Sequence, residues 1–425
     1  MSSSEQVELE LGQKALVLGG GIRSDDGTNP AHKRHGIYEP LTRRQIWFRV
    51  AIIVIAACSC LAVGIGIGVS VSVGESGGGA GAAEVSGVYA DAASDPEDYL
   101  SFLVVGDWGR RGEHNQTAVA EAMGRCAAVS KPAFVVSVGD NFYEGGLNSL
   151  DDPEFKQSFT DVYNHQSLQV PWHAVLGNHD YGDCGYDEEQ EGRPPKECPA
   201  AADSSRSPSF QLDPSLRRHD WRWYAGRNFE HRPVADVHMC FVDTNPHVSY
   251  YYSQNRSDLI NIPGGLGQQD ADAGKDKLKS TLQDSDARWK LVFGHHPMQS
   301  NGFWGDVEDV RTALEDIIMQ GGAAAYFNGH DHDLQHTPGD IKTVPVNCSG
   351  VTTSVERRLH HFTSGAGSKT GRGFGTSSTR FEHDGAGFAS VRVSHDRIKV
   401  QFWGPALQGA EGLLYSYDIA PPLGC

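Results

Sequence analysis

The sequence carries too little positive charge for a nucleic-acid-binding protein. Its 36 Lys and Arg residues are outnumbered by 54 Asp and Glu residues, which gives a formal net charge of -18 at pH 7. This balance argues against a nucleic-acid partner, which would require a basic surface. The net negative charge also repels anionic substrates at long range, so an anionic substrate would have to be captured by local positive charge, such as that of a metal site.

Cysteine is scarce as well, with 8 residues in the chain. Two of them lie in an apolar segment near the N-terminus, and the other six form an even set that agrees with disulfides in an exported protein. We expect buried free thiols at Cys126 and Cys240, which fall in an apparent helix and an apparent strand. The acidic insert at 182–208 contains Cys184 and Cys198, and a disulfide that closes the loop between them would contribute roughly 3 kcal/mol.

Charged residues are absent from 50–74. A segment of about 25 residues is long enough to cross a bilayer as a helix that rises about 1.5 Å per residue. A cleaved signal peptide is the alternative, but its apolar core is normally only about 7 to 15 residues long. Residues 1–49 are polar and have no apolar period, which predicts a disordered tail and favours an uncleaved signal anchor.

The charges on either side of this segment predict its orientation. Five Lys and Arg residues lie between positions 33 and 49, whereas Glu residues follow the segment. By the positive-inside rule, the tail is cytoplasmic and the rest is extracellular or luminal, as in a single-pass type II membrane protein. Residues 75–97, which begin with a Gly- and Ala-rich run, are predicted to form a flexible stalk. Glycosylation sequons that agree with export occur at Asn115, Asn255 and Asn347.

From residue 98 onward, short apolar runs alternate with amphipathic stretches, which predicts an α/β fold. The runs predict strands at 102–105, 135–138, 172–176, 237–242, 291–293 and 323–327. Helices are expected around 121–129, 155–163, 276–282 and 307–319. Beyond His360 the pattern changes to strands, including 388–393 and 398–403. We therefore expect one domain over 98–425, in which a second sheet packs against the first.

Five of the predicted strands end in a short polar motif. The motifs are Gly106-Asp107-Trp108-Gly109, Gly139-Asp140-Asn141-Phe142-Tyr143, Gly177-Asn178-His179-Asp180, Gly294-His295-His296-Pro297 and Gly329-His330-Asp331-His332. Open α/β sheets bind ligands beyond the carboxyl ends of their strands, so we expect these loops to converge. Carboxylate, amide and imidazole groups in this number suit a dinuclear metal site, in which Asp140 would bridge two cations. Tyr143 adds a phenolate, a hard donor suited to a trivalent ion.

The five motifs follow the patterns GDxG, GDxxY, GNHD, GHxP and GHDH in this order. The chain thereby resembles the calcineurin-like metallophosphoesterases and, within them, the purple acid phosphatases of the small, mammalian tartrate-resistant type. The resemblance covers roughly residues 98–403. It implies a two-sheet β-sandwich flanked by helices and an acid phosphatase that acts on small phosphate monoesters or phosphoproteins.

The resemblance also implies which residues hold the two metal ions. Its ferric site corresponds to Asp107, Asp140, Tyr143 and His332. Its divalent site, for Fe, Zn or Mn, corresponds to Asp140, Asn178, His295 and His330. The donor chemistry agrees with this division, because anionic oxygens suit Fe(III), whereas an amide and two imidazoles suit a divalent ion. A trivalent ion should acidify bound water more than Zn²⁺ does, which favours activity at acid pH.

Three further residues are candidates for catalysis. His179 matches a family residue that lies beside the phosphate as an electrostatic partner or proton donor. Asp180 is expected either to orient the His179 ring or to have a structural role. His296 departs from the mammalian type, which has an aromatic residue at this place, and we expect it to contact the substrate or to support a ligand.

Two other classes of function stay open at this point. A related phosphodiesterase or protein phosphatase usually has an Asp-x-His pair and no Tyr at the place of Tyr143, whereas this chain has Asp107-Trp108-Gly109. A non-catalytic, membrane-tethered binding protein that keeps the fold would be expected to have lost ligands, and none of the expected ligands is missing.

Overall fold

The computed structural model describes residues 89–183, 206–252, 257–348, 351–405 and 412–421. The predicted tail, the 50–74 segment and most of the predicted stalk lie outside these residues, as do Cys184 and Cys198. Within the described ranges, no helix is both long enough and apolar enough to span a membrane.

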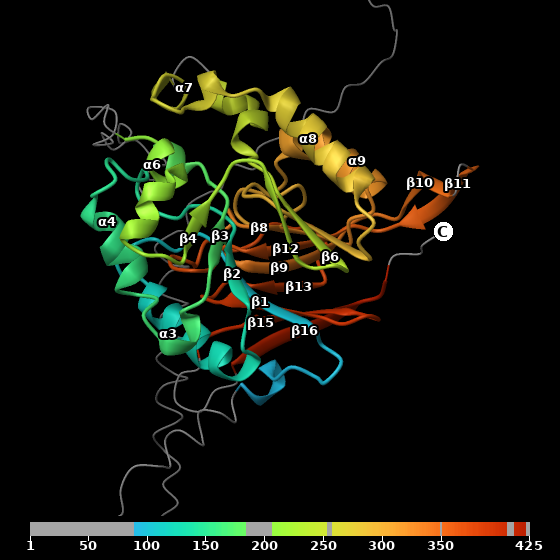
Figure 1. Cartoon of the computed structure of the whole chain (residues 1–425), viewed down its shortest axis with the longest axis horizontal. Coiled ribbons are helices and arrows are strands. Elements are labelled where there is room, and N and C mark those ends of the chain that lie inside the picture. Colours follow the sequence, from blue (N-terminus) through green and yellow to red (C-terminus); the bar gives the residue numbers. More distant parts are fainter. Residues whose placement is uncertain (1–88, 184–205, 253–256, 349–350, 406–411, 422–425) are drawn as a thin grey trace, which may run out of the picture. The chain divides into compact units, whose positions relative to one another are not determined.

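Two seven-stranded sheets form the framework of the fold (Figure 1). The first has the order β16 (Leu413–Ile419), β15 (Ile398–Trp403), β14 (Phe388–Val393), β1 (Leu100–Val105), β2 (Phe134–Ser137), β3 (Trp172–Ala174) and β4 (Trp223–Ala225). The second has the order β13 (Phe381–His383), β9 (Leu334–Pro338), β12 (His360–Ser364), β8 (Ala325–Asn328), β7 (Trp289–Phe293), β6 (Val237–Phe241) and β5 (Phe229–Val234). The predicted α/β fold with two sheets is confirmed, and each predicted strand is present to within about two residues at its ends.

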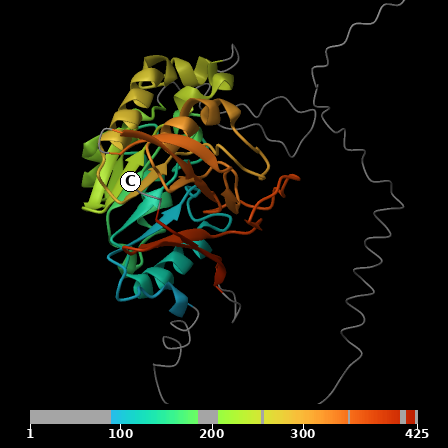
Figure 2. The ribbon, with the colours of Figure 1, turned by 90° about the vertical axis from the view of Figure 1, so that its right-hand side faces the viewer.

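The helices lie on the outer faces of the two sheets (Figure 1). They are α3 (Gln116–Ser130), α4 (Pro153–Phe155), α6 (Ser209–Leu212), α7 (Ser257–Ile260), α8 (Ala271–Asp284) and α9 (Glu308–Gln320). The helix expected at 155–163 is instead the short α4 followed by a π-helical stretch, Lys156–Thr160. A hairpin of β10 (Lys342–Cys348) and β11 (Val351–Arg357) projects from the body (Figures 1 and 2).

Alternating side chains divide the hydrophobic core into layers. Because successive side chains of a strand point to opposite faces, Phe102 and Val104 of β1 pack between the two sheets. Leu103 and Val105 point to the outer face, where they pack with apolar residues of α3. Apolar residues of α8 and α9 pack on the outer face of the second sheet. Cys126 and Cys240 are buried free thiols, as predicted.

The strands that carry the predicted motifs belong to a set of parallel strands within each sheet. β1, β2 and β3 pair in parallel in the first sheet. In the second sheet, β6, β7, β8 and β12 do the same. Parallel strands present their carboxyl ends at one edge of a sheet, which is where open α/β sheets bind ligands.

The domain begins earlier than predicted, because residues 89–97 belong to it and not to a flexible stalk. Tyr89 is fully buried, and its ring centroid lies 5.4 Å from that of Trp403. A little further on, the Asp95 carboxylate accepts a hydrogen bond of 2.5 Å from Arg397. The sequence pattern missed this segment because a single Tyr in a short polar stretch has no periodicity.

We expect Tyr89→Ala to lower the free energy of unfolding by about 3 kcal/mol or more, because it leaves a cavity beside Trp403. Tyr99→Ala is the matched control, since that ring is 37% exposed and its loss should change stability by only about 0.5 kcal/mol. Urea denaturation of both variants measures the difference. Equal losses would mean that the Tyr89 contact does not stabilise the domain.

Candidate metal centre

The predicted ligands lie in the turns that follow the parallel strands. Asp107 comes after β1, Asp140 after β2 and His330 after β8, and all three have a left-handed backbone, with φ of 60°, 51° and 71°. This conformation costs of order 1–3 kcal/mol at a residue other than glycine and is found mostly at functional sites. The strain therefore falls in three of the five loops that the motifs marked in the sequence.

The glycines that precede the ligands allow the loops to approach one another. A methyl group at Gly177 would overlap the carboxylate of Asp140, and one at Gly329 would overlap the carboxylate of Asp107. The motif glycines are thus required by close packing around the ligand side chains.

The four residues predicted to hold the ferric ion converge. The Tyr143 hydroxyl lies 2.9 Å from Oδ2 of Asp140, 3.2 Å from Oδ1 of Asp107 and 3.2 Å from Nε2 of His332. Nε2 of His332 lies 3.5 Å from Oδ1 of Asp107. Ligand atoms that share one ion at bond lengths of about 2.1 Å are themselves about 3.0 to 3.4 Å apart, so these separations suit a common ion.

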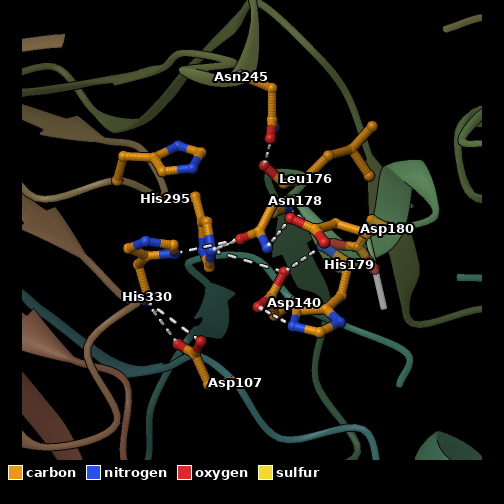
Figure 3. A network of polar contacts seen from close by, with 12 residues as sticks. Asp107, Asp140, Leu176, Asn178, His179, Asp180, Asn245, His295 and His330 are labelled. Atoms are coloured by element: carbon orange, nitrogen blue, oxygen red, sulfur yellow. Dashed lines mark hydrogen bonds and ion pairs between the residues drawn. The ribbon is translucent and has the colours of Figure 1, made fainter. Parts of the chain in front are cut away.

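The four residues predicted to hold the divalent ion also converge, as Figure 3 shows. Oδ1 of Asn178 lies 3.0 Å from Nε2 of His295 and 3.1 Å from Nδ1 of His330. Oδ1 of Asp140 lies 3.5 Å from Nε2 of His295. Asp140 therefore turns Oδ1 toward one group and Oδ2 toward the other, as a bridging carboxylate does.

The electrostatics of these side chains fit a pair of cations. Burial, together with the neighbouring Asp140, raises the pKa of Asp107 and of Tyr143 well above their ordinary values. Burial, together with His295, lowers the pKa of His330 to about 3, which keeps the imidazole neutral and its lone pair available. Buried acidic oxygens packed against one another ionise only when positive charge is beside them. The donor set therefore suits two metal ions.

A second layer of hydrogen bonds orients the ligands. His295 directs Nδ1 at the carbonyl oxygen of Val138, at 2.8 Å, which leaves Nε2 for the metal site. The Asn178 amide nitrogen donates to the carboxylate of Asp183 at 3.0 Å, which turns the amide oxygen toward the histidines. Such partners tune ligand geometry and typically cost 10- to 100-fold in metal affinity or activity when lost. Asp183 carries no motif of its own and was not predicted.

His179 lies at the edge of the centre and lines a cavity of 460 Å³. Its backbone N–H donates to Oδ1 of Asp140 at 2.9 Å, and its ring centroid lies 4.3 Å from that of Tyr143. The side chain is 14% exposed. This position is compatible with contact to a bound phosphate, and the catalytic role of His179 stays a prediction.

Asp180 does not orient the His179 ring. The hydrogen bonds support the other expectation for Asp180, which is a structural role. Nδ1 of His179 has no hydrogen-bond partner among the described residues. The Asp180 carboxylate instead accepts hydrogen bonds from the backbone N–H groups of Asn141, at 2.9 Å, and Gly177, at 2.8 Å. It also accepts one from the Gln211 side chain at 2.8 Å. Asp180 thus ties the loop after β2 to the loop after β3.

Asp180→Asn should lower the free energy of unfolding by about 1–3 kcal/mol, because the amide N–H₂ group replaces an oxygen that accepts backbone hydrogen bonds. Folded Asp180→Asn should keep the wild-type pH–rate profile, which a residue that acts through His179 would shift. Denaturant titration and the pH dependence of kcat/KM measure the two effects. A changed pH profile with unchanged stability would mean that Asp180 acts in catalysis through His179.

His296 lies among the ligands, but its ring nitrogens are already engaged. It falls in a group with His295 and His330 whose candidate ligand atoms lie within 4.8 Å of one another. Nδ1 of His296 is 2.7 Å from the Thr244 hydroxyl, and Nε2 is 2.8 Å from the Tyr251 hydroxyl. A neutral imidazole has one donor and one acceptor, so both are in use. These contacts support a positioning role, in which His296 ties residues 249–252 to the metal loops, and contact of His296 with a substrate stays a prediction.

Three cationic side chains that the motifs did not reveal also line the cavity, namely Arg110, Lys369 and Arg372. The Arg110 guanidinium lies 3.5 Å above the ring of Tyr143. Lys369 and Arg372 follow β12, in a glycine-rich stretch that itself comes after an apolar run. That combination is the signal in the sequence that would have revealed them. These residues supply local positive charge in a chain whose net charge is -18.

The two-sheet fold and the paired ligand groups define a metallophosphoesterase. A family model described as calcineurin-like phosphoesterase matches residues 100–334. Purple acid phosphatase 3 of Arabidopsis thaliana is 37% identical over 318 residues, which cover 73% of this chain and 76% of that protein. Human tartrate-resistant acid phosphatase type 5 is 26% identical over 319 residues, which cover 71% of this chain and 86% of that protein.

The chain therefore belongs to the purple acid phosphatases, which are phosphoric monoester hydrolases with a dinuclear metal centre. The predicted resemblance is confirmed. Among solved structures, a Plasmodium protein described as GAP50, the anchor in the inner membrane complex, has a TM-score of 0.54. It is 19% identical, with 76% of this chain and 89% of that chain covered, and this likeness supports the fold alone.

Proposed function

We propose that this chain is a membrane-anchored acid phosphatase with an Fe(III) ion and a divalent Fe, Zn or Mn ion. One observation carries the proposal most directly. Asp140 directs one carboxylate oxygen toward Tyr143 and the other toward His295, so that two ligand groups of different chemistry share one residue. The Tyr143 side favours a trivalent ion, and the side with an amide and imidazoles favours a divalent one.

In this proposal, the ligands of the ferric ion are Asp107, Asp140, Tyr143 and His332, and those of the divalent ion are Asp140, Asn178, His295 and His330. When bound, the two ions supply Lewis-acid activation of the phosphate and of the attacking water. Arg110, Lys369 and Arg372 attract the dianionic substrate and bind phosphate oxygens. His179 holds the proton that passes to the leaving oxygen.

The test of this function uses the full chain, purified with its metals and assayed on phenyl phosphate. We expect about two metal ions per chain, one of them iron, and hydrolysis between about pH 4 and pH 7, a window set by acidification of metal-bound water. A diaryl phosphate separates the alternatives, because a phosphodiesterase would prefer it to the monoester. A chain that holds two metals and hydrolyses neither compound would support the non-catalytic alternative.

Residues 50–74 are proposed to anchor the chain, with residues 1–49 in the cytoplasm and the metal centre on the extracellular or luminal side. The support is the uncharged segment and the basic residues before it. In sealed vesicles with the cytoplasmic face outward, added protease should remove a tag at residue 1 and spare a tag at residue 425. The reverse pattern would contradict this orientation.

A further inference from the structure

Two large aromatic side chains are exposed beside the metal centre. Phe303 is 47% exposed and Trp304 is 41% exposed. The Trp304 ring stacks on the ring of the proposed ligand His330 with an interplanar angle of 29° and with centroids 5.6 Å apart. Phe303 meets Trp304 at a right angle at 5.2 Å, and the Arg372 guanidinium lies 5.6 Å and 5.5 Å from the centres of the two rings. We call Phe303, Trp304 and Arg372 the aromatic wall.

The loop that presents the aromatic wall is held firmly. The backbone N–H of Trp304 donates to the buried carboxylate of Asp331, which stands between His330 and His332, at 2.7 Å. The backbone N–H of Asn301 donates to the buried Gln335 side chain at 2.8 Å. The rings are therefore exposed on a loop that is fixed to the metal-binding turn, which is how a preorganised binding surface is built.

The wall also contains a guanidinium group whose hydrogen bonds are incomplete among the described residues. Nη1 of Arg372 is buried and has no hydrogen-bond partner within the described ranges. Buried guanidinium nitrogens normally have an acceptor, and an anionic oxygen is the strongest one. Arg372 and Trp304 both line the cavity of 460 Å³, which has room for a whole organic ester and not only for its phosphate.

From these contacts we infer that the aromatic wall is the leaving-group subsite, and that it selects phosphate monoesters whose alcohol carries a flat aromatic ring near the ester oxygen. This inference rests on the proposed function and names its substrate class. Arg372 would bind a phosphate oxygen while the ring lies against Trp304, which Phe303 supports, and ring–ring and cation–ring contacts there add to apolar burial. Because Trp304 packs on His330, a ring joined to the ester oxygen directly or through one carbon reaches the wall. A nucleobase is separated from the ester oxygen by a sugar, so we expect it to gain less from the wall.

The test compares benzyl phosphate with cyclohexylmethyl phosphate, using the full-length, metal-loaded chain. Both compounds release a primary alcohol, and they differ mainly in the shape of the ring, which is flat in benzyl phosphate and puckered in cyclohexylmethyl phosphate. We expect kcat/KM to favour benzyl phosphate by about 3- to 10-fold, the size of a ring–ring contact. Trp304→Leu should reduce the preference below about 2-fold, and Trp304→Phe should largely keep it. Trp221→Leu is the matched control, because Trp221 is 52% exposed and lies outside the cavity lining.

A binding measurement separates this inference from the proposed function. Calorimetry with benzylphosphonate and cyclohexylmethylphosphonate, which are not hydrolysed, should show the same preference and its loss in Trp304→Leu. If these phosphonates bind with the ring preference while no phosphate monoester is hydrolysed, the subsite stands and the phosphatase function fails. Either an unchanged ring preference in Trp304→Leu or an equal change in Trp221→Leu would overturn the subsite. A loss of kcat/KM in Trp304→Leu that is larger for adenosine 5′-monophosphate than for benzyl phosphate would overturn it as well.

Discussion

Replacing Asp140 with Asn should remove the metal ions and abolish most of the activity. The amide has nearly the same size, but it lacks the charge and one of the two oxygens that face Tyr143 and His295. We expect metal content to fall from about two ions per chain to less than one, and kcat/KM to fall by about 1,000-fold or more. The basis for this magnitude is that residues that only support metal ligands already cost 10- to 100-fold.

Asp243→Asn is the matched control for this change. Asp243 is buried, follows strand β6 of the second sheet and accepts hydrogen bonds from Tyr181 and Asn245, but it lies outside both ligand groups. Its variant should keep two metals per chain and activity within about 10-fold of wild type. Elemental analysis and kinetics of the two folded variants make the comparison. If Asp140→Asn retained both ions, the bridging assignment would be wrong.

The fold could be predicted from sequence because its strands are short, apolar and separated by polar turns. The run at 134–137 illustrates the point, since Phe134 and Val136 pack between the sheets while Val135 packs on the outer face. The uniform burial of such a strand gives a continuous apolar run. The π-helical stretch Lys156–Thr160 was not predicted, because its side chains follow a helical pattern and only the backbone hydrogen bonds differ.

The convergence of the motif loops could be predicted because each ligand follows a strand closely. Once β1, β2 and β3 are parallel, Asp107, Asp140 and Asn178 have little freedom to lie anywhere but at one edge. The rotation of each side chain was not predictable in the same way. Asp180 and His296 both lie within two positions of a proposed ligand in the sequence, yet Asp180 turns toward the backbone of Asn141 and His296 turns toward Tyr251.

The contacts that complete the site come from residues without a motif. Arg110 lies over Tyr143, which is 33 positions later in the chain, and Arg372 lies over Trp304 from another strand end. The sequence around Arg110 does not distinguish a solvated surface residue from one that covers a ligand ring. Such contacts depend on how loops from different strands meet, and this becomes visible only when both sheets are in place.

The second large effect concerns Tyr143, whose hydroxyl has the shortest contact in the proposed ferric group, 2.9 Å to Asp140. A phenolate bound to Fe(III) gives a charge-transfer band in the visible, so by its family the oxidised protein should be purple. Tyr143→Phe removes the donor oxygen and keeps the ring under Arg110. We expect the visible band to vanish while some iron is retained by Asp107, Asp140 and His332, and activity to fall mainly through weaker metal retention.

Tyr181→Phe provides a strict control for the colour, because Tyr181 is also buried and also donates a hydrogen bond to a carboxylate, that of Asp243. It lies outside the proposed ferric group, so its variant should keep both the band and the iron. The visible spectrum, recorded together with iron content, distinguishes loss of the chromophore from loss of the metal. Tyr143→Phe could instead keep the same spectrum and a full complement of Fe(III). The Tyr143 oxygen would then not be a ligand of the ferric ion, and Tyr143 would be a packing residue.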